Sequence, residues 1–430
     1  MDSTVAATAT PWPLAQKLAF RFFVIFFPVF IFFNPNGAVP FLSEMYQLYI
    51  PPMHRVVVWG AANVLHLPYP ITVFTNGSGD TSYDYLVLLF CVFVALVGSA
   101  VWSAVNRKAC NYDKLYYWLT VILRFYVGIM MLSYGAVKVI KLQFPSPGLM
   151  KLMQPYGNSS PMGLAWTFMG FSKGYNYFTG FAEVACGALL LFRRTALLGS
   201  VIGLVVAANI MAINYCFDVP VKILSTMLVV IMLFLLFKDI DRFINFFFLN
   251  RVAQPANLTP KRFKRRWQNR LLMTIKYILI GYVTLSLAEN IFYSAKYSGD
   301  AAPKPALYGI YETQTFIRNS NTLAPLTTDT TRWRRLVVAY KGYASIYLMN
   351  DSTRNYAFEP DTFRKTVTMY KYSDTSKKYK LNYKLQNGML QIKGKLQKDT
   401  VEISLKRFDE KQFLLTKRGF HWVNEYPFNR

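Results

Sequence analysis

The sequence predicts a multi-pass α-helical membrane protein that ends in an all-β antiparallel domain. Hydrophobic residues make up 53% of the 430 residues, whereas charged residues make up only 16%. Several apolar runs reach the length of about 20 residues that a helix needs to span a bilayer. After Asn290 the pattern changes to an alternation of apolar and polar residues with period two, which is typical of β-strands. A helical membrane region is therefore followed by a separate β-domain.

The apolar runs predict about seven membrane-spanning helices. The first run is longer than the apolar core of a secretory signal peptide and no A-x-A-like cleavage site follows it, so we interpret it as a transmembrane helix. The expected spans cover residues 17–34, 83–105, 117–140, 175–192, 195–215, 220–237 and 271–290.

Basic residues predict how these spans are oriented. The net charge is +26, and Lys and Arg precede the first and last spans and separate the second from the third and the fourth from the fifth. The densest cluster is RVAQPANLTPKRFKRRWQNR, residues 251–270. Because cytoplasmic loops are enriched in Lys and Arg, we expect a cytoplasmic N-terminus in the inner (plasma) membrane and an extracytoplasmic, periplasmic β-domain. The bilayer accounts for the charge without a nucleic-acid partner.

The longer connections predict further elements. Between the first two spans, MYQLYIPPMHRVVVWGAANVL is expected to lie as a helix at the membrane interface. The connection between the third and fourth spans is too apolar for a solvated loop, which favours a re-entrant or surface-lying segment. We divide the chain into N-terminal helices (1–116), a four-helix region (117–240), a basic loop with the last span (241–292) and the β-domain (300–430).

The C-terminal region predicts about eight short antiparallel strands in sequence. Runs such as RRLVVAYKG, KYKLNYKL and TVEISLKRF alternate in polarity, and MNDS, QNG and QKDT stand between them as turns. This order favours a meander, with a small closed barrel of lipocalin-like type as one form of it. The aromatic C-terminus RGFHWVNEYPFNR is expected to dock on the barrel.

Cysteine and histidine spacing argues against bound redox cofactors. Four cysteines show no CxxC or other paired spacing, and none of the three histidines falls in a predicted span. We therefore expect no cofactor that is bound covalently or through metal ligands. The β-domain shows no pair of acids, no Ser–His–Asp set and no metal-ligand spacing.

Polar residues inside the predicted spans indicate a site. Glu183 lies about eight residues from the outer surface, roughly 12 Å at the rise of a helix. Lys138, Asn209 and Lys222, in three neighbouring spans, fall at the same depth, and Tyr134 lies near the same end. A lone intramembrane acid usually pairs with a base inside the bundle.

Three interpretations of this set remain open. The pair of Glu183 with Lys138 could hold the helices in register, or the set could form a pocket that handles a ligand or a proton. Alternatively, Lys138 and Lys222 could extend to the outer headgroups without any pair. Arg124 is separate, because it lies in the inner third of its span, where it can reach the inner interface or a backbone carbonyl.

Two segments resemble the DoxX-like family. ILRFYVGIMMLSYGAVKV (122–139) is similar to the first helix of that family, and FTGFAEVACGALLLFRRTALLGSVI (178–202) is similar to the second. The resemblance covers the third to sixth spans and implies a four-helix membrane bundle of the DoxX or MauE type. It also implies that Arg124, Lys138 and Glu183 occupy the patterned polar positions, and links the chain to quinone-dependent sulfur oxidation or membrane oxidoreductase complexes.

From the residues and the resemblance we expect a subunit of a membrane redox or envelope-stress complex. Its pocket would hold a quinone headgroup or small polar ligand, with Glu183 exchanging a proton and Lys138, Tyr134, Asn209, Lys222 and Arg124 binding the ligand. The alternative is a non-enzymatic scaffold whose β-domain binds an envelope partner. A third is a transport protein or one similar to vitamin K-dependent carboxylase-like proteins, which share the order of helices and outer β-domain.

Overall fold

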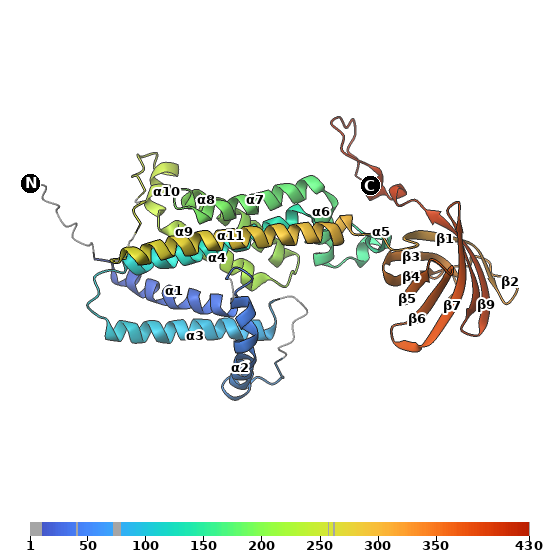
Figure 1. The fold of residues 1–430 in the computed structure, drawn as a ribbon, viewed down its shortest axis with the longest axis horizontal. Coiled ribbons are helices and arrows are strands. Elements are labelled where there is room, and N and C mark those ends of the chain that lie inside the picture. Colours follow the sequence, from blue (N-terminus) through green and yellow to red (C-terminus); the bar gives the residue numbers. More distant parts are fainter. Residues whose placement is uncertain (1–10, 40–41, 72–78, 257, 261–262, 430) are drawn as a thin grey trace, which may run out of the picture. The chain divides into compact units, whose positions relative to one another are not determined.

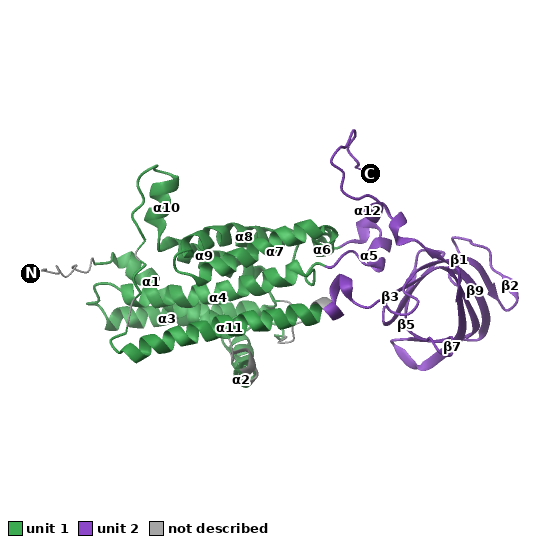
Figure 2. Cartoon of the chain, turned by 45° about the horizontal axis from the view of Figure 1, so that its top comes forward, with its two compact units in different colours: residues 1–144, 160–295 green, residues 145–159, 296–430 purple. Residues whose placement is uncertain are grey.

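The computed structural model describes residues 11–39, 42–71, 79–256, 258–260 and 263–429, which form two compact units. The helical unit comprises the described residues of 1–144 and 160–295, and the second unit comprises 145–159 and 296–430 (Figure 2). The second unit contains the β-sheet. Since residues 145–159 lie between two helices of the first unit in sequence, the chain leaves the helical unit, packs a short segment with the β-domain and returns.

Helices occupy all seven ranges for which the sequence predicts a span. They are α1 (Leu14–Phe33), α3 (Ser82–Val105), α4 (Asp113–Val139), α7 (Lys173–Leu191), α8 (Ala196–Cys216), α9 (Lys222–Phe237) and α11 (Arg266–Tyr297). Five of them, α1, α3, α4, α8 and α11, are long and apolar enough to cross a membrane. α9 passes that test only together with α10 (Ile240–Phe247), across a bend of 81°. α7, which carries Lys173 and Glu183, is not among the five.

Shorter helices form the connections. α2 (Leu42–Asn63) occupies the segment predicted to lie at the interface and crosses the direction of α1 and α3 (Figure 1). The connection after α4 folds into α5 (Leu149–Met153), the 3₁₀ turn η1 (Tyr156–Asn158) and α6 (Pro161–Phe171). The remaining elements are the 3₁₀ turns η2 (Gly299–Ala301) and η3 (Glu410–Gln412) and the helix α12 (Leu414–Lys417).

Side-chain caps begin several of these helices. Thr81 and Asp84 form a capping box at α3, in which the Asp84 carboxylate accepts from the Thr81 backbone N–H at 2.9 Å. Ser160 and Ser172 cap α6 and α7 through their hydroxyl oxygens. Asp80 caps α9 from a distant part of the chain, accepting from the N–H groups of Lys222 at 2.5 Å and Ile223 at 2.9 Å. The start of α9 is thereby tied to the start of α3.

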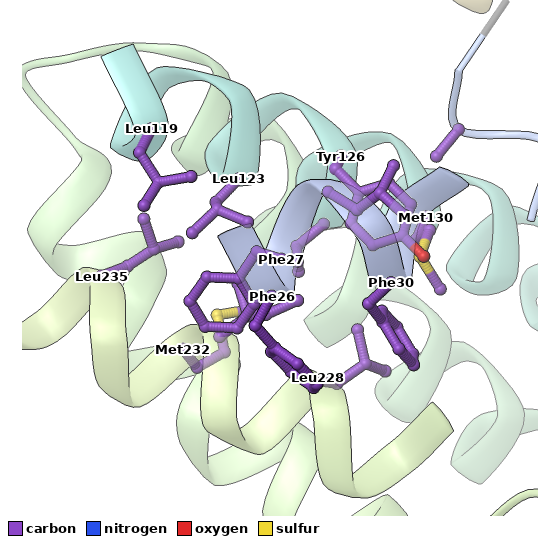
Figure 3. Packing of buried hydrophobic residues seen from close by; sticks show 14 of the residues in the cluster. Phe26, Phe27, Phe30, Leu119, Leu123, Tyr126, Met130, Leu228, Met232 and Leu235 are labelled. Atoms are coloured by element: carbon purple, nitrogen blue, oxygen red, sulfur yellow. The ribbon is translucent and has the colours of Figure 1, made fainter. Parts of the chain in front are cut away.

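Phenylalanines from α1 form the centre of the helical core. Phe27 and Phe30 are fully buried and pack among leucines and methionines of α4 and α9 (Figure 3). The ring of Phe27 lies 5.1 Å from that of Phe234 in an edge-to-face arrangement. The buried residues that surround the two rings include Leu119, Leu123, Met130, Leu228, Met232 and Leu235. The core therefore joins the N-terminal helices to the predicted four-helix region.

The C-terminal region forms an eight-stranded antiparallel barrel, which confirms the predicted meander. The strands are β1 (Gly309–Arg318), β3 (Trp333–Tyr340), β4 (Gly342–Leu348), β5 (Thr353–Asp361), β6 (Thr366–Lys371), β7 (Asp374–Gln386), β8 (Met389–Leu396) and β9 (Asp399–Phe408). Each pairs with the next, and β1 pairs with β9 to close the barrel; the short β2 (Asn321–Thr322) adds to β1.

The turn between β7 and β8 follows the sequence prediction closely. Gln386 pairs with Met389, so Asn387 and Gly388 form a two-residue loop. Both loop residues have positive φ, 48° and 76°. Such a loop is the preferred hairpin connection because its twist matches that of the strands, and Asn-Gly accepts the backbone conformation at little cost.

Apolar side chains fill the barrel interior. Residues that alternate along each strand point inward, as Leu390 and Ile392 do in β8, both fully buried. An eight-stranded barrel is just wide enough for such side chains to fill it. A cavity of about 80 Å³ at one end is lined in part by Arg318, Arg354 and Asp399.

The 145–159 segment packs against the outside of this barrel. Leu149 of α5 is 1% exposed and lies in a cluster with Ile310 of β1 and Val337 of β3. Ser146 donates to the Asp300 carboxylate twice, from its N–H at 2.8 Å and its hydroxyl at 2.7 Å. A connection between two helices is thus part of the β-domain.

The C-terminal tail does not dock on the barrel, contrary to the prediction. Trp422 is 91% exposed, and Phe420, Val423 and Tyr426 are also exposed. Arg418 lies over the ring of Phe428 at 4.5 Å, so the tail makes contacts within itself.

Candidate functional site

A buried ion pair joins α4 to α7. The Lys138 ammonium donates to Oε1 of Glu183, and the two side chains are only 7% and 2% exposed. Lys138 is one of the two bases that the sequence offers as a partner for Glu183, and the structure joins these two side chains. Burying both charges is tolerated because each neutralises the other.

Glycines allow α4 and α7 to approach closely enough for this pair. A Cβ atom on Gly135 would lie 2.6 Å from the carbonyl oxygen of Gly180, and one on Gly187 would lie 2.6 Å from that of Gly128. Real Cβ atoms do not come that near, so the two helices touch along their backbones. Small residues at helix interfaces serve this purpose in membranes.

A cavity of about 290 Å³ opens beside the ion pair. α4, α6, α7 and α8 all contribute to its lining. Its polar residues are Lys138, Gln143, Thr179, Glu183, Asn209 and Asn214. Its larger apolar residues include Phe144, Trp166, Met169, Tyr175, Phe178 and Ile210. An apolar cavity with a few converging polar groups is the usual form of a small-molecule site.

One carboxylate oxygen in this cavity is left without a partner. Glu183 Oε2 is buried and has no hydrogen-bond partner among the described residues. A buried polar atom without a partner costs free energy, so a donor that reached this oxygen would be favoured. Lys138 and Asn209 line the same cavity and can donate to an acceptor on the same ligand.

The corner between α6 and α7 shapes one wall. Asn176 is fully buried, and its side-chain amide donates to the backbone oxygens of Met169 at 2.5 Å and Ser172 at 3.1 Å. Trp166 of α6 packs its ring edge against Phe144 at 5.1 Å. These contacts place α6 over the cavity, so the part of the connection that forms α6 is a wall of the site rather than a solvated loop.

Asn209 lines the cavity beside the ion pair, whereas Lys222 does not. The Lys222 ammonium lies 3.0 Å from Asp218, whose side chain is 85% exposed. Lys222 is the first residue of α9, whose start is capped by Asp80, and its side chain is not part of the cavity lining. Sequence depth alone could not show which way the side chain turns.

Tyr134 and Arg124 also lie elsewhere. Tyr134 lines a different cavity, of about 210 Å³, together with Asn36, Asp80 and Asp84. Arg124 is 7% exposed and donates from Nε to the carbonyl oxygen of Leu190 at 2.8 Å. It thus binds a backbone carbonyl, one of its two expected positions.

Sequence reasoning missed several residues. Gln143 and Tyr175 line the cavity but fall outside or at the edge of predicted spans. Arg21, interpreted as flanking the first span, is 3% exposed and donates to Tyr112 Oη, Ser103 Oγ and the Asn106 carbonyl at 2.7–2.9 Å. Its acceptors are about 80–90 residues away in the sequence, so no local sequence pattern predicts these hydrogen bonds.

The described residues offer no metal site. They contain no group of three or more His, Cys, Asp or Glu side chains that could hold a metal ion. The cavity beside the ion pair offers the donors of Lys138 and Asn209 and the Oε2 of Glu183, unpaired among the described residues, in an apolar surrounding.

The fold and site define a class: a protein of membrane-type helices that buries an ion pair beside a cavity and carries a β-barrel domain. The chain belongs to the same family as the uncharacterized protein YwoB of Bacillus subtilis (strain 168). The two are 40% identical over 124 residues, which cover 29% of this chain and 79% of YwoB. No family model and no solved structure matches the chain.

Proposed function

We propose that this protein binds a small polar ligand, best a quinone headgroup, in the cavity beside Glu183. The observation that carries the proposal is the buried Oε2 of Glu183, which has no partner among the described residues. In this function the protein is a DoxX-like subunit of a membrane redox or envelope-stress complex. The likeness of 122–139 and 178–202 to DoxX-like helices supports that assignment, because Lys138 and Glu183 are its patterned polar residues.

The side chains have complementary roles towards such a ligand. Lys138 and Asn209 donate hydrogen bonds to its oxygens, and the open Glu183 oxygen accepts one from a hydroxyl or exchanges a proton. Reduction of a quinone to a quinol takes up two electrons and two protons, and the electrons come from the partner subunit. The aromatic rings of Trp166 and Tyr175 provide the apolar surface on which a ring can lie.

The proposal includes a membrane topology. In this topology the seven helices across the inner membrane are α1, α3, α4, α7, α8, α9 and α11. The N-terminus is cytoplasmic and the barrel is extracytoplasmic. α7 can cross because Lys138 neutralises Glu183. α9 has 16 residues and is roughly 24 Å long, so it reaches across only if α10 turns into the interface.

Binding measurements on the purified full-length protein test the ligand. A water-soluble short-chain quinone is titrated against the wild type, Asn209→Leu and Glu183→Gln. Loss of one hydrogen bond to a charged group is expected to weaken binding by about ten-fold. Lys222→Gln is the matched control, because its side chain lies outside the cavity lining. Equal binding by wild type and Glu183→Gln would remove Glu183 from the site, and no binding by the wild type would exclude the quinone.

A second candidate function is a scaffold whose β-domain binds an envelope partner. The filled barrel interior favours it, because a lipocalin-like barrel that carries a ligand needs internal space. We therefore limit the lipocalin-like resemblance to strand number and order. Cross-linking in membranes separates the two functions. A partner that is retained in Asn209→Leu but lost when the barrel surface is changed supports the scaffold.

A further inference from the structure

Four cationic side chains from four parts of the helical unit come together at one end of the bundle. They belong to α4, the turn after α7, the C-cap of α9 and the first half of α11, and are Arg124, Arg193, Lys238 and Lys276. Arg124 interacts electrostatically with Arg193, and both interact with Lys238 and with Lys276. Arg124 and Lys138 are fourteen positions apart on α4, roughly 21 Å, so this cluster is separate from the cavity of the ion pair.

The geometry of the cluster is fixed by neutral groups. Arg193 donates to Tyr117 Oη at 2.5 Å and to the carbonyl oxygen of Leu258 at 2.8 Å. The Lys276 ammonium lies over the rings of Phe125 and Phe192, at 5.9 and 5.5 Å. Since those two rings directly follow Arg124 and directly precede Arg193, Lys276 is held beside both guanidinium groups.

Arg124 leaves most of its donors unused. Its side chain is 93% buried, and only Nε donates, to the Leu190 carbonyl at 2.8 Å. A guanidinium has five N–H donors, and Nε makes the one hydrogen bond that Arg124 forms among the described residues. The Nη nitrogens are not among the fully buried atoms without a partner, so an acceptor can reach them.

Carboxylates compensate the cluster only in part. Among the described residues none of the four cations forms an ion pair, and Asp239, which attracts the Lys238 ammonium, also accepts from Arg242 at 2.8 Å. Like charges at close range repel one another. An anion bound among them would remove the repulsion and supply the missing acceptors, and phosphate oxygens suit both guanidinium and ammonium groups.

The surroundings favour an anion that carries acyl chains. Phe192, Phe237 and Ile275, next to the cationic residues in sequence, are all half or more exposed. α10 leaves α9 at 81°, and Phe246 and Phe247 at its end and the C-cap Phe248 are exposed. An amphipathic helix of this kind lies in the plane of the interface, where lipid headgroups are.

We propose that Arg124, Arg193, Lys238 and Lys276 form a binding site for the phosphate of an anionic phospholipid. The lipid headgroup enters between α4, α9 and α11, and its chains cover the exposed aromatic side chains. This site does not depend on the quinone proposal, since it shares no residue with the cavity.

Lipid binding to the delipidated full-length protein in detergent tests the site. Phosphatidylglycerol and phosphatidylcholine with identical chains are titrated, with the thermal unfolding midpoint and a native-mass binding measurement as readouts. Wild type is expected to prefer phosphatidylglycerol, and Lys276→Gln and Arg193→Gln are each expected to weaken its binding by about five-fold. Lys108→Gln, an exposed lysine between α3 and α4, is the matched control and leaves the preference unchanged.

Two outcomes would overturn the proposal. The first is the same lipid preference in Lys276→Gln, Arg193→Gln and wild type. The second is stabilisation of the wild type by inorganic phosphate that equals the stabilisation by phosphatidylglycerol, because the site would then take a free anion. Lys276 is only partly buried, so its variant remains informative even if Arg124→Gln does not fold.

Discussion

Gly135 on α4 faces Gly180 on α7 so closely that a Cβ atom on Gly135 would lie 2.6 Å from the Gly180 carbonyl oxygen. The two helices run antiparallel here, and Val139 and Val184, which lie against Gly180 and Gly135, directly follow Lys138 and Glu183 in sequence. The backbone contact therefore brings the ammonium and the carboxylate together. Packing and charge at this interface depend on each other.

Gly135→Ala is expected to destabilise the helical unit. The added methyl group meets backbone atoms of Gly180 and Val184 at 2.6–2.8 Å, and backbone cannot move aside as a side chain can. We expect the free energy of unfolding to fall by about 1–3 kcal/mol. Thermal unfolding in detergent measures it.

Gly281→Ala is the matched control for this change. Gly281 lies inside α11 with nothing within 4 Å of the added Cβ, so alanine should stabilise the helix by about 0.5–1 kcal/mol. A Gly135→Ala protein as stable as the wild type would show that α4 and α7 are not in backbone contact.

Glu183→Gln is expected to cost more than removal of both charges. The single change leaves the Lys138 ammonium buried without its counter-ion, which lowers the free energy of unfolding by about 3–5 kcal/mol. The double variant Lys138→Met, Glu183→Leu removes both charges and should approach wild-type stability. Thermal unfolding compares the variants under identical conditions.

The double variant also separates the two roles of the pair. If it is stable yet no longer binds the quinone, the pair serves a ligand and not only helix register. If Glu183→Gln alone is as stable as the wild type, the ion pair does not stabilise the bundle.

The order of the strands and Lys138 as one available partner of Glu183 could be predicted from sequence, whereas the position of Lys222 could not. Lys138 and Glu183 lie inside regular helices, so depth follows from counting residues at a fixed rise. Lys222 begins its helix, and a cap from Asp80, about 140 residues earlier, decides where that start lies. The barrel follows from period-two alternation and from Asn-Gly at a turn.

Arg21 and the 145–159 segment show why long-range contacts could not be predicted from the sequence. Arg21 is one basic residue in an aromatic helix, and only the fold reveals that three neutral acceptors surround it. The sequence around Leu149 predicts a loop at the membrane. In the structure Leu149 packs instead on β1 and β3, which begin about 160 residues or more further along the chain. Such contacts depend on which segments meet in space, and no local periodicity encodes them.

Cysteine labelling tests the proposed topology with native residues. Cys110 lies between α3 and α4, Cys216 ends α8, and both are exposed, whereas Cys91 and Cys186 are buried. The topology puts Cys110 in the cytoplasm and Cys216 outside. A membrane-impermeant maleimide added to spheroplasts should label Cys216, and Cys110 only after permeabilisation. Cys110→Ser and Cys216→Ser identify each label, and labelling of both residues without permeabilisation would contradict the topology.

Leu149→Ala should release the 145–159 segment from the barrel. Leu149 is 1% exposed and packs against Ile310 and Val337, and truncation of such a side chain costs about 2–5 kcal/mol. We expect faster amide hydrogen exchange in 145–159 and little change in strands away from β1 and β3. Leu326→Ala is the control, because Leu326 is 60% exposed on the same unit. Unchanged exchange in Leu149→Ala would show that other contacts hold the segment.

Acid should weaken the barrel at the seam between β1 and β9. Hydrogen bonds from Arg318, at 2.6 Å, and Asn319, at 2.7 Å, hold the pKa of the Asp399 carboxyl below its usual value. Because the pKa is lower in the folded state, the ionised carboxylate stabilises the barrel above the unfolded value of about 3.9. That contribution is lost as the pH falls through the folded pKa. Thermal unfolding of the full-length protein, followed by its β-sheet circular dichroism, measures this loss. We expect the unfolding midpoint of the barrel to fall as the pH is lowered from 5.

Asp399→Asn isolates the part of the acid sensitivity that belongs to the seam. The variant keeps the shape of the side chain but cannot ionise, so it should be less stable at neutral pH and lose less stability on acidification than the wild type. Asp351→Asn is the control, since it removes an exposed carboxylate from the turn between β4 and β5. If Asp399→Asn and Asp351→Asn show the same pH dependence, the Arg318–Asp399 contact does not hold the barrel closed. A smaller acid effect in Asp399→Asn alone would assign part of the acid sensitivity to the contact between the first and last strands of the barrel.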